Sequence, residues 1–143
     1  MCQINNRLEY LPEELTTYKV LLKGLQDTLL APFGTIDADS PGVVYPFIYK
    51  IGESYEEHGS TLDANREKLA KGYFHSFLQL SDAIDYRKSI GLNKNNSIIV
   101  KCTIPENTLV YHGLTAVEEF GGGRYFDSVA STKITIEREL NIL

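Results

Sequence analysis

The chain has 143 residues, of which 43% are hydrophobic and 23% charged, and its formal net charge is −5. This length and apolar content fit one folded domain spanning residues 1–143 and argue against a wholly disordered chain. The acidic balance disfavours a surface that tracks nucleic-acid phosphates, and no apolar run is long enough to predict a transmembrane helix.

Cysteine usage and the first residues indicate the compartment. Cys2 and Cys102 are the only cysteines, which is too few for a disulfide framework. The first seven residues carry no apolar core of signal-peptide length. We therefore expect free thiols in a reducing compartment and a cytoplasmic location.

Residues 11–30 mix two periodicities. Leucines recur at helical spacings, whereas the threonines and valine among them favour extended structure. We predict a short helix over Pro12–Leu15, because proline is favoured at a first helical position, and a strand over Thr17–Leu22. The prolines, glycines and aspartates of residues 31–42 predict a loop.

The next segments alternate between apolar and polar. Val43–Ile51 is predicted as a strand that is either at a sheet edge or split, because Pro46 cannot donate a ladder hydrogen bond. Residues 52–59 are predicted as a loop and Leu62–Ala70 as a polar surface helix. The aromatic-rich Tyr73–Leu78 is predicted to be extended.

The clearest helix signal covers residues 81–90. Ser81 is a favourable N-cap residue, and Asp82 in the first turn interacts well with the positive end of the helix dipole. Gly91 is placed to adopt the left-handed conformation that ends many helices.

The last third of the chain is predicted to consist mainly of strands. Ser97–Ile104 alternates on both faces, and a turn joins it to a shorter strand over Thr108–His112. Residues Glu118–Arg124 are predicted as a loop and Thr132–Glu137 as a final half-buried strand. These elements predict an α+β fold, with a mostly antiparallel sheet and a few covering helices.

The histidines and cysteines do not form a recognisable metal motif. His58, His75 and His112 lack helical i, i+4 spacing and a neighbouring cysteine pair, so neither a metal site nor a bound cofactor is expected. Cys102 and His112 could pair across a hairpin as a nucleophile and its base. The favoured interpretation is a packed thiol and a separate, exposed imidazole.

A late group of polar residues resembles the elements of ADP-ribosyltransferases in their order along the chain, although less chain separates them. The resemblance implies that His112 would hold the nicotinamide end of NAD and that Glu139 would orient the ribose. The residues that carry it are Tyr111-His112-Gly113, Ser131-Thr132 and Glu137-Arg138-Glu139.

Most of the chain after its first fifteen residues resembles a family of small uncharacterised phage and bacterial α+β proteins. The matching segments are Tyr18–Leu21, Tyr49–Gly52, Gly72–Phe77 with Leu80–Ala83, Ile99–Pro105 and Ala130–Ile134. The resemblance implies a fold and is nearly silent on function. His75 has a fixed place in this pattern, either as a site residue or as a ring packed under the helix.

These observations favour a protein that acts by binding to another protein. We expect a small acidic cytosolic protein that binds another protein, with a phage-encoded inhibitor of a host defence protein as the specific case, and without direct nucleic-acid or membrane binding. The alternative is an NAD-dependent ADP-ribosyltransferase-like enzyme, for which the candidate catalytic residues are His75, His112 and Glu139. A self-associating module is the third hypothesis, and the sequence does not predict the oligomeric state.

Overall fold

The structure is a computed structural model that describes residues 3–24, 26, 28–30, 35–36, 44–45, 48–56, 74–119 and 122–142. Strands dominate these residues, and α1 (Leu80–Ser89) is the one α-helix among them. The strands are β1 (Gln3–Tyr10), β2 (Leu15–Lys23), β3 (Leu29–Leu30), β4 (Thr35–Ile36), β5 (Val44–Tyr45), β6 (Ile48–Tyr49), β7 (Ser54–Glu56), β8 (Phe74–Phe77), β9 (Ser97–Ile104), β10 (Leu109–Glu119), β11 (Gly122–Ser131) and β12 (Lys133–Leu140).

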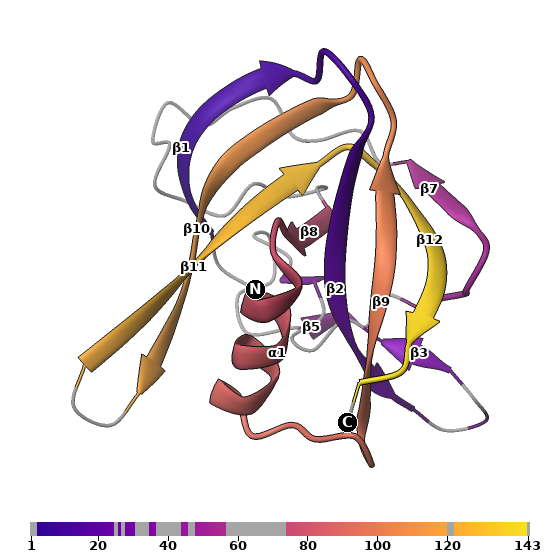
Figure 1. Cartoon of the computed structure of the whole chain (residues 1–143), viewed down its shortest axis with the longest axis vertical. Helices are drawn as coiled ribbons and strands as arrows, with labels where there is room; N and C mark the ends of the chain where they lie inside the picture. Colours follow the sequence, from indigo (N-terminus) through magenta and orange to yellow (C-terminus); the bar gives the residue numbers. More distant parts are fainter. Residues whose placement is uncertain are drawn as a thin grey trace.

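One large antiparallel sheet organises the molecule. Its strand order is β1-β10-β11-β8-β2-β9-β12-β7, with β3 paired to β2 and β6, while β4 and β5 form a separate two-stranded ribbon. The sheet is strongly bent, so that β1, β10 and β11 form one wall and β2, β9 and β12 the other (Figure 1). Within the described residues, no helix is both long and apolar enough to cross a membrane.

Both faces of the sheet are buried in its centre, as β9 illustrates. Val100, Cys102 and Ile104 belong to one apolar cluster, whereas Ile99 belongs to the other. A fully buried side chain of this size contributes about 1.5–3 kcal/mol through removal of apolar surface from water. The alternation predicted for Ser97–Ile104 is therefore confirmed, and Ile99 faces the second core, whereas Lys101 and Thr103 on the same face are half-buried.

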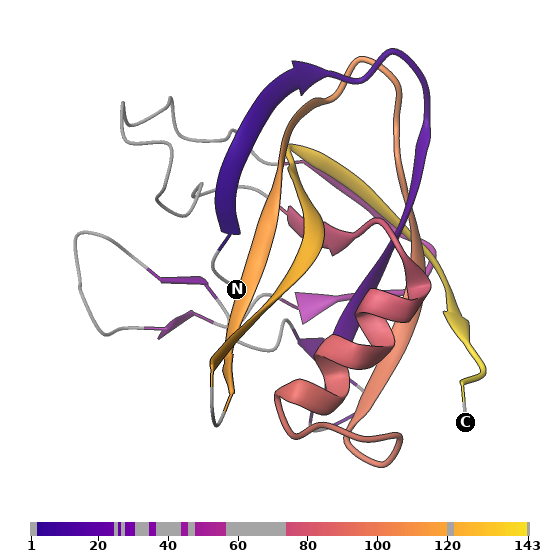
Figure 2. The ribbon, with the colours of Figure 1, turned by 60° about the vertical axis from the view of Figure 1, so that its left-hand side comes forward.

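The helix α1 covers one face of the sheet beside β2, β8 and β11 (Figure 2). Its Tyr86 ring lies 4.8 Å from the Phe77 ring and 5.9 Å from the Phe126 ring, measured between centroids. Such aromatic pairs add about 0.5–1.5 kcal/mol beyond the area that they bury. The aromatic contacts therefore attach the helix to two strands at once.

The two ends of α1 differ in how well the sequence predicted them. The helix begins after Gln79, whose carbonyl accepts from the amide of Ala83, so the prediction of Ser81 as N-cap is wrong by two residues. At the other end Gly91 has φ +78°, and the Leu92 amide donates to the Arg87 carbonyl. This left-handed ending is confirmed.

The predicted fold class is wrong, because the described chain is largely all-β and has a single helix instead of several covering helices. Where a helix was predicted over Pro12–Leu15, residues 11–14 are irregular and β2 begins at Leu15. The leucine spacing misled because β2 is buried on both faces and carries apolar residues at odd and even positions. The helix predicted over Leu62–Ala70 lies outside the described residues.

Three predicted loops contain strands. β7 occupies part of residues 52–59, and β10 and β11 form a long hairpin where Glu118–Arg124 was predicted as a loop. The predicted loop over residues 31–42 contains β4, and its other residues lie outside the described part. Gly122 and Gly123 lie in β11, paired with Glu119 and Glu118 of β10, which shows why a glycine run alone does not define a loop.

The remaining predicted strands are confirmed with shifted ends. Thr17–Leu22 lies within β2, Tyr73–Leu78 contains β8, and Thr132–Glu137 overlaps β12. Val43–Ile51 is split: β5 pairs with β4, whereas β6 pairs with β3 in the other sheet. The strand predicted over Thr108–His112 is longer and runs to Glu119 as β10.

Candidate functional site

The three sequence-predicted site residues lie on three separate strands. His75 is on β8, His112 on β10 and Glu139 on β12, and between β10 and β12 the sheet order places β11, β8, β2 and β9. His112 Nε2 lies 2.5 Å from Glu9 Oε1 on β1, and Glu139 is exposed opposite Val100. The structure thus gives each residue its own surroundings.

The proposed pairing of Cys102 with His112 depends on a hairpin that the structure does not contain. β9 pairs with β2 and β12, whereas β10 pairs with β1 and β11. Cys102 is fully buried, and burial raises the pKa of its thiol to about 12. A neutral thiol in an apolar cluster is a packing residue, because the thiolate is the nucleophilic form.

His75 is half-buried, but its ring nitrogen Nδ1 is shielded from solvent and has no hydrogen-bond partner among the residues that the structure describes. Burial, followed by the nearby Lys19, lowers the pKa of His75 to about 3. The imidazole is therefore neutral at pH 7 and cannot act as a cation there.

An internal polar cluster, which sequence reasoning did not identify, lies on the sheet face opposite α1. It consists of Thr17, Lys19, Ser76 and Cys102. Thr17 stands opposite Cys102, and Lys19 opposite Val100, in the pairing of β2 with β9. Since Phe77 of β8 stands opposite Tyr18, the antiparallel register places Ser76 beside Lys19. Three polar side chains and the Cys102 thiol therefore share one buried patch.

Lys19 is the charged member of this cluster and is only 6% exposed. Its Nζ donates to the His75 carbonyl oxygen at 2.5 Å and lies 5.1 Å from the centroid of the Tyr49 ring. Burial lowers the pKa of its amine to about 8. The amine is therefore a cation held by a carbonyl and an aromatic face at neutral pH.

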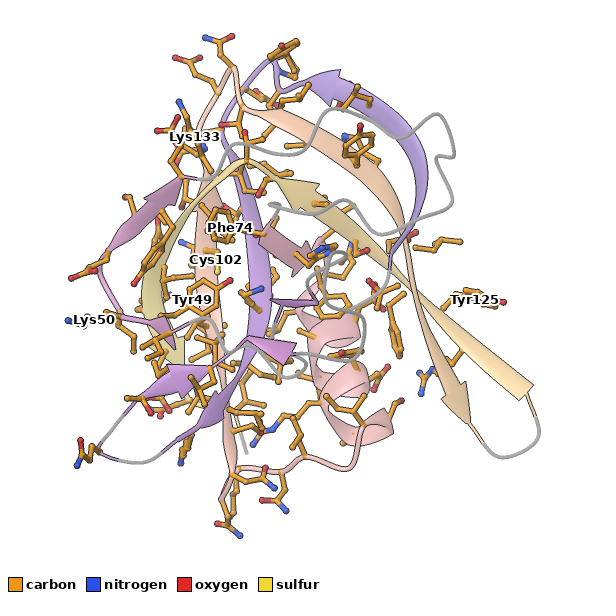
Figure 3. All side chains as sticks on the ribbon, turned by 180° about the vertical axis from the view of Figure 1, so that it is seen from behind. Tyr49, Lys50, Phe74, Cys102, Tyr125 and Lys133 are labelled. Carbon is orange, nitrogen blue, oxygen red and sulfur yellow. The ribbon has the colours of Figure 1, made fainter. Side chains whose placement is uncertain are left out.

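Three aromatic rings close over this part of the sheet. The Tyr49 ring is 5.4 Å from the Tyr55 ring and 6.3 Å from the Phe74 ring. Figure 3 shows Tyr49, Phe74 and Cys102 on the same side of the sheet. The cluster is thus bounded by apolar surface, where an electrostatic interaction is stronger than in water.

The strand β1 is a second feature with functional potential. It ends the sheet order, so in the described part of the chain its outer edge pairs with no strand. Leu8 and Tyr10 on β1 are 38% and 69% exposed. Their alternation with Arg7 and Glu9 is a period-two signal that could have predicted this strand.

None of the protein-family models, curated proteins or solved structures compared with the chain matches it. Among the residues that the structure describes, no group of three or more His, Cys, Asp and Glu side chains is arranged to hold a metal ion. The internal polar cluster and the open edge of β1 are the two features of the described residues that bear on function.

Proposed function

We propose that the protein binds another protein by accepting an extended segment of its partner at the outer edge of β1. The observation that carries this proposal is an eight-residue edge strand whose described side chains include two exposed apolar residues, Leu8 and Tyr10. An open edge supplies unpaired backbone donors and acceptors, and the side chains beside it provide selectivity.

The other end of the sheet is less suited to this role. β7 is only three residues long, and the adjacent part of β12 exposes Glu137, Arg138 and Glu139. Charged residues on an edge discourage further strand pairing. The contrast between the two ends favours β1 as the binding edge.

The net charge of −5 adds a preference for a partner with a basic binding surface, because charge of opposite sign speeds association. A phage-encoded inhibitor that occupies a host defence protein is the specific form of this proposal. A protein with a basic groove would be a suitable target.

The experiment compares capture of partners by the wild-type protein and by a variant that carries Leu8→Lys and Tyr10→Lys. Lysine on an edge strand opposes strand addition, and both positions are exposed, so the fold should persist. A Tyr125→Lys variant is the matched control, since Tyr125 is 58% exposed and lies on β11.

We expect the wild-type protein and the Tyr125→Lys variant to bind the same partner. The β1 variant should lose affinity for that partner about tenfold or more. Equal affinity of all three proteins for the partner, or absence of any stable complex with the wild-type protein, would refute binding through β1.

A further inference from the structure

The internal polar cluster has hydrogen-bonding capacity that the described protein does not use. Thr17 Oγ1 and Ser76 Oγ are buried, and neither has a hydrogen-bond partner. Both side chains are fully excluded from solvent. A buried hydroxyl without a partner costs about 1–3 kcal/mol, so two such groups on one face indicate a missing polar partner.

The charge of the cluster defines that partner further. The Lys19 ammonium has three donors and gives one to a carbonyl, and in the described part of the chain it makes no ion pair. The thiol of Cys102 remains neutral because burial raises its pKa to about 12. A buried cation without an anionic partner is unfavourable, and an anion would offset the cost.

We infer that the internal polar cluster is a binding site for the carboxylate group of a small organic acid. Lys19 supplies the charge, and the hydroxyls of Thr17 and Ser76 donate to the carboxylate oxygens. The rings of Tyr49 and Phe74 provide the apolar surface against which the rest of the acid packs. A single buried cation matches a monoanion, whereas a dianion such as phosphate would keep one uncompensated charge.

The ring that covers Lys19 also suggests how the acid reaches it. Tyr49 belongs to β6, a strand of two residues whose partner among the described strands is the equally short β3. So short a ribbon has few hydrogen bonds to lose. Displacement of this ribbon from the sheet would therefore cost less than separation of the long strands and would give the acid a route to Lys19.

The test is the melting temperature in acetate and in benzoate, compared with chloride at the same ionic strength and pH 7. A ligand that binds only the folded state raises the melting temperature, by about 5 °C for a chain of this length at roughly ten times its Kd. Chloride lacks the two oxygen acceptors of a carboxylate, so the increase should be larger in the organic acids.

Matched variants separate a specific site from a general salt effect. Lys19→Met should abolish the extra increase, whereas Lys23→Met, on the same strand but exposed, should retain it. Thr17→Val keeps the charge and should reduce the increase, which provides a second variant if Lys19→Met does not fold. An equal increase in Lys19→Met and the wild-type protein, or no increase in the wild-type protein, would overturn the inference.

The pH dependence gives an independent readout. The described ionisable groups around the amine are Cys102 on β9, His75 on β8 and Tyr49 on β6. Burial raises the pKa of Cys102 and lowers the pKa of His75, whereas the pKa of Lys19 is lowered to about 8, so the Lys19 amine loses its charge above neutral pH. The increase caused by acetate should therefore be smaller at pH 9 than at pH 7. A variant with Leu8→Lys and Tyr10→Lys should respond as the wild-type protein does, because neither residue belongs to the cluster.

Discussion

Replacement of the buried lysine by an uncharged residue of similar length should make the protein more stable at neutral pH. The pKa of Lys19 is lowered from 10.5 to about 8, with burial as the main cause. Because one pKa unit corresponds to about 1.36 kcal/mol, holding this charge costs the folded state about 3 kcal/mol below pH 8. Lys19→Met removes the charge and keeps most of the side-chain volume.

A loss partly offsets this gain. The Nζ of Lys19 donates to the His75 carbonyl oxygen, and methionine leaves that acceptor without this partner. A lost hydrogen bond of this kind costs about 1 kcal/mol. We therefore expect Lys19→Met to raise the free energy of unfolding by about 2 kcal/mol at pH 7.

The pH dependence follows from the direction of the shift. Between pH 8 and pH 10.5 the unfolded chain binds more protons at Lys19 than the folded chain does. The wild-type protein should therefore gain stability from this residue as the pH rises through that window, and Lys19→Met should not. Other groups titrate there in both proteins, so the measured quantity is the difference between them.

The assay is urea denaturation of both proteins at several pH values between 7 and 10.5, in chloride buffers without organic acids. The advantage of Lys19→Met should be largest at pH 7 and should fall through zero towards the upper end of the window, because the lost hydrogen bond remains a cost once the charge is gone. Lys23→Met, an exposed position on the same strand, is the control and should change stability little. A destabilised Lys19→Met at pH 7, or a difference that does not change with pH, would refute the reasoning.

Three other predictions concern the histidines and the edge strand. Because burial lowers the pKa of His75 to about 3, this residue should cost stability increasingly as the pH falls from 6.5 towards 3, and His75→Gln should reduce the acid sensitivity measured by urea denaturation. His112 and Glu139 lie on non-adjacent strands, so millimolar NAD should leave the melting temperature of the wild-type protein unchanged. If NAD raised the melting temperature of the wild-type protein but not that of Glu139→Gln, the enzyme hypothesis would be supported instead. If copies of the protein associate through β1, Tyr10→Lys should lower the average mass measured by light scattering relative to the wild-type protein, because lysine on an edge strand opposes strand pairing. An unchanged mass distribution would show that association does not use this edge.

Local patterns predicted the elements whose residues carry their own signal. The alternation from Ile98 to Ile104 defined β9 because successive side chains of a strand point to opposite faces. Gly91 marked the end of α1 because a residue without Cβ adopts positive φ at little cost. The same reasoning failed at Pro12–Leu15, where the two-faced burial of β2 imitates helical periodicity.

The candidate features depended on pairings between distant segments. The sequence alone identified a strand around Lys19, but it could not tell that this strand lies between β8 and β9, because nothing local specifies which strands pair. Leu15 pairs with Ile104, nearly ninety residues away. That long-range register buried the amine of Lys19 beside Ser76, separated Cys102 from His112, and left β1 at the edge of the sheet. Side-chain periodicity is a local property of the backbone, whereas burial depends on which strands and helices pack together, and only the tertiary structure decides that.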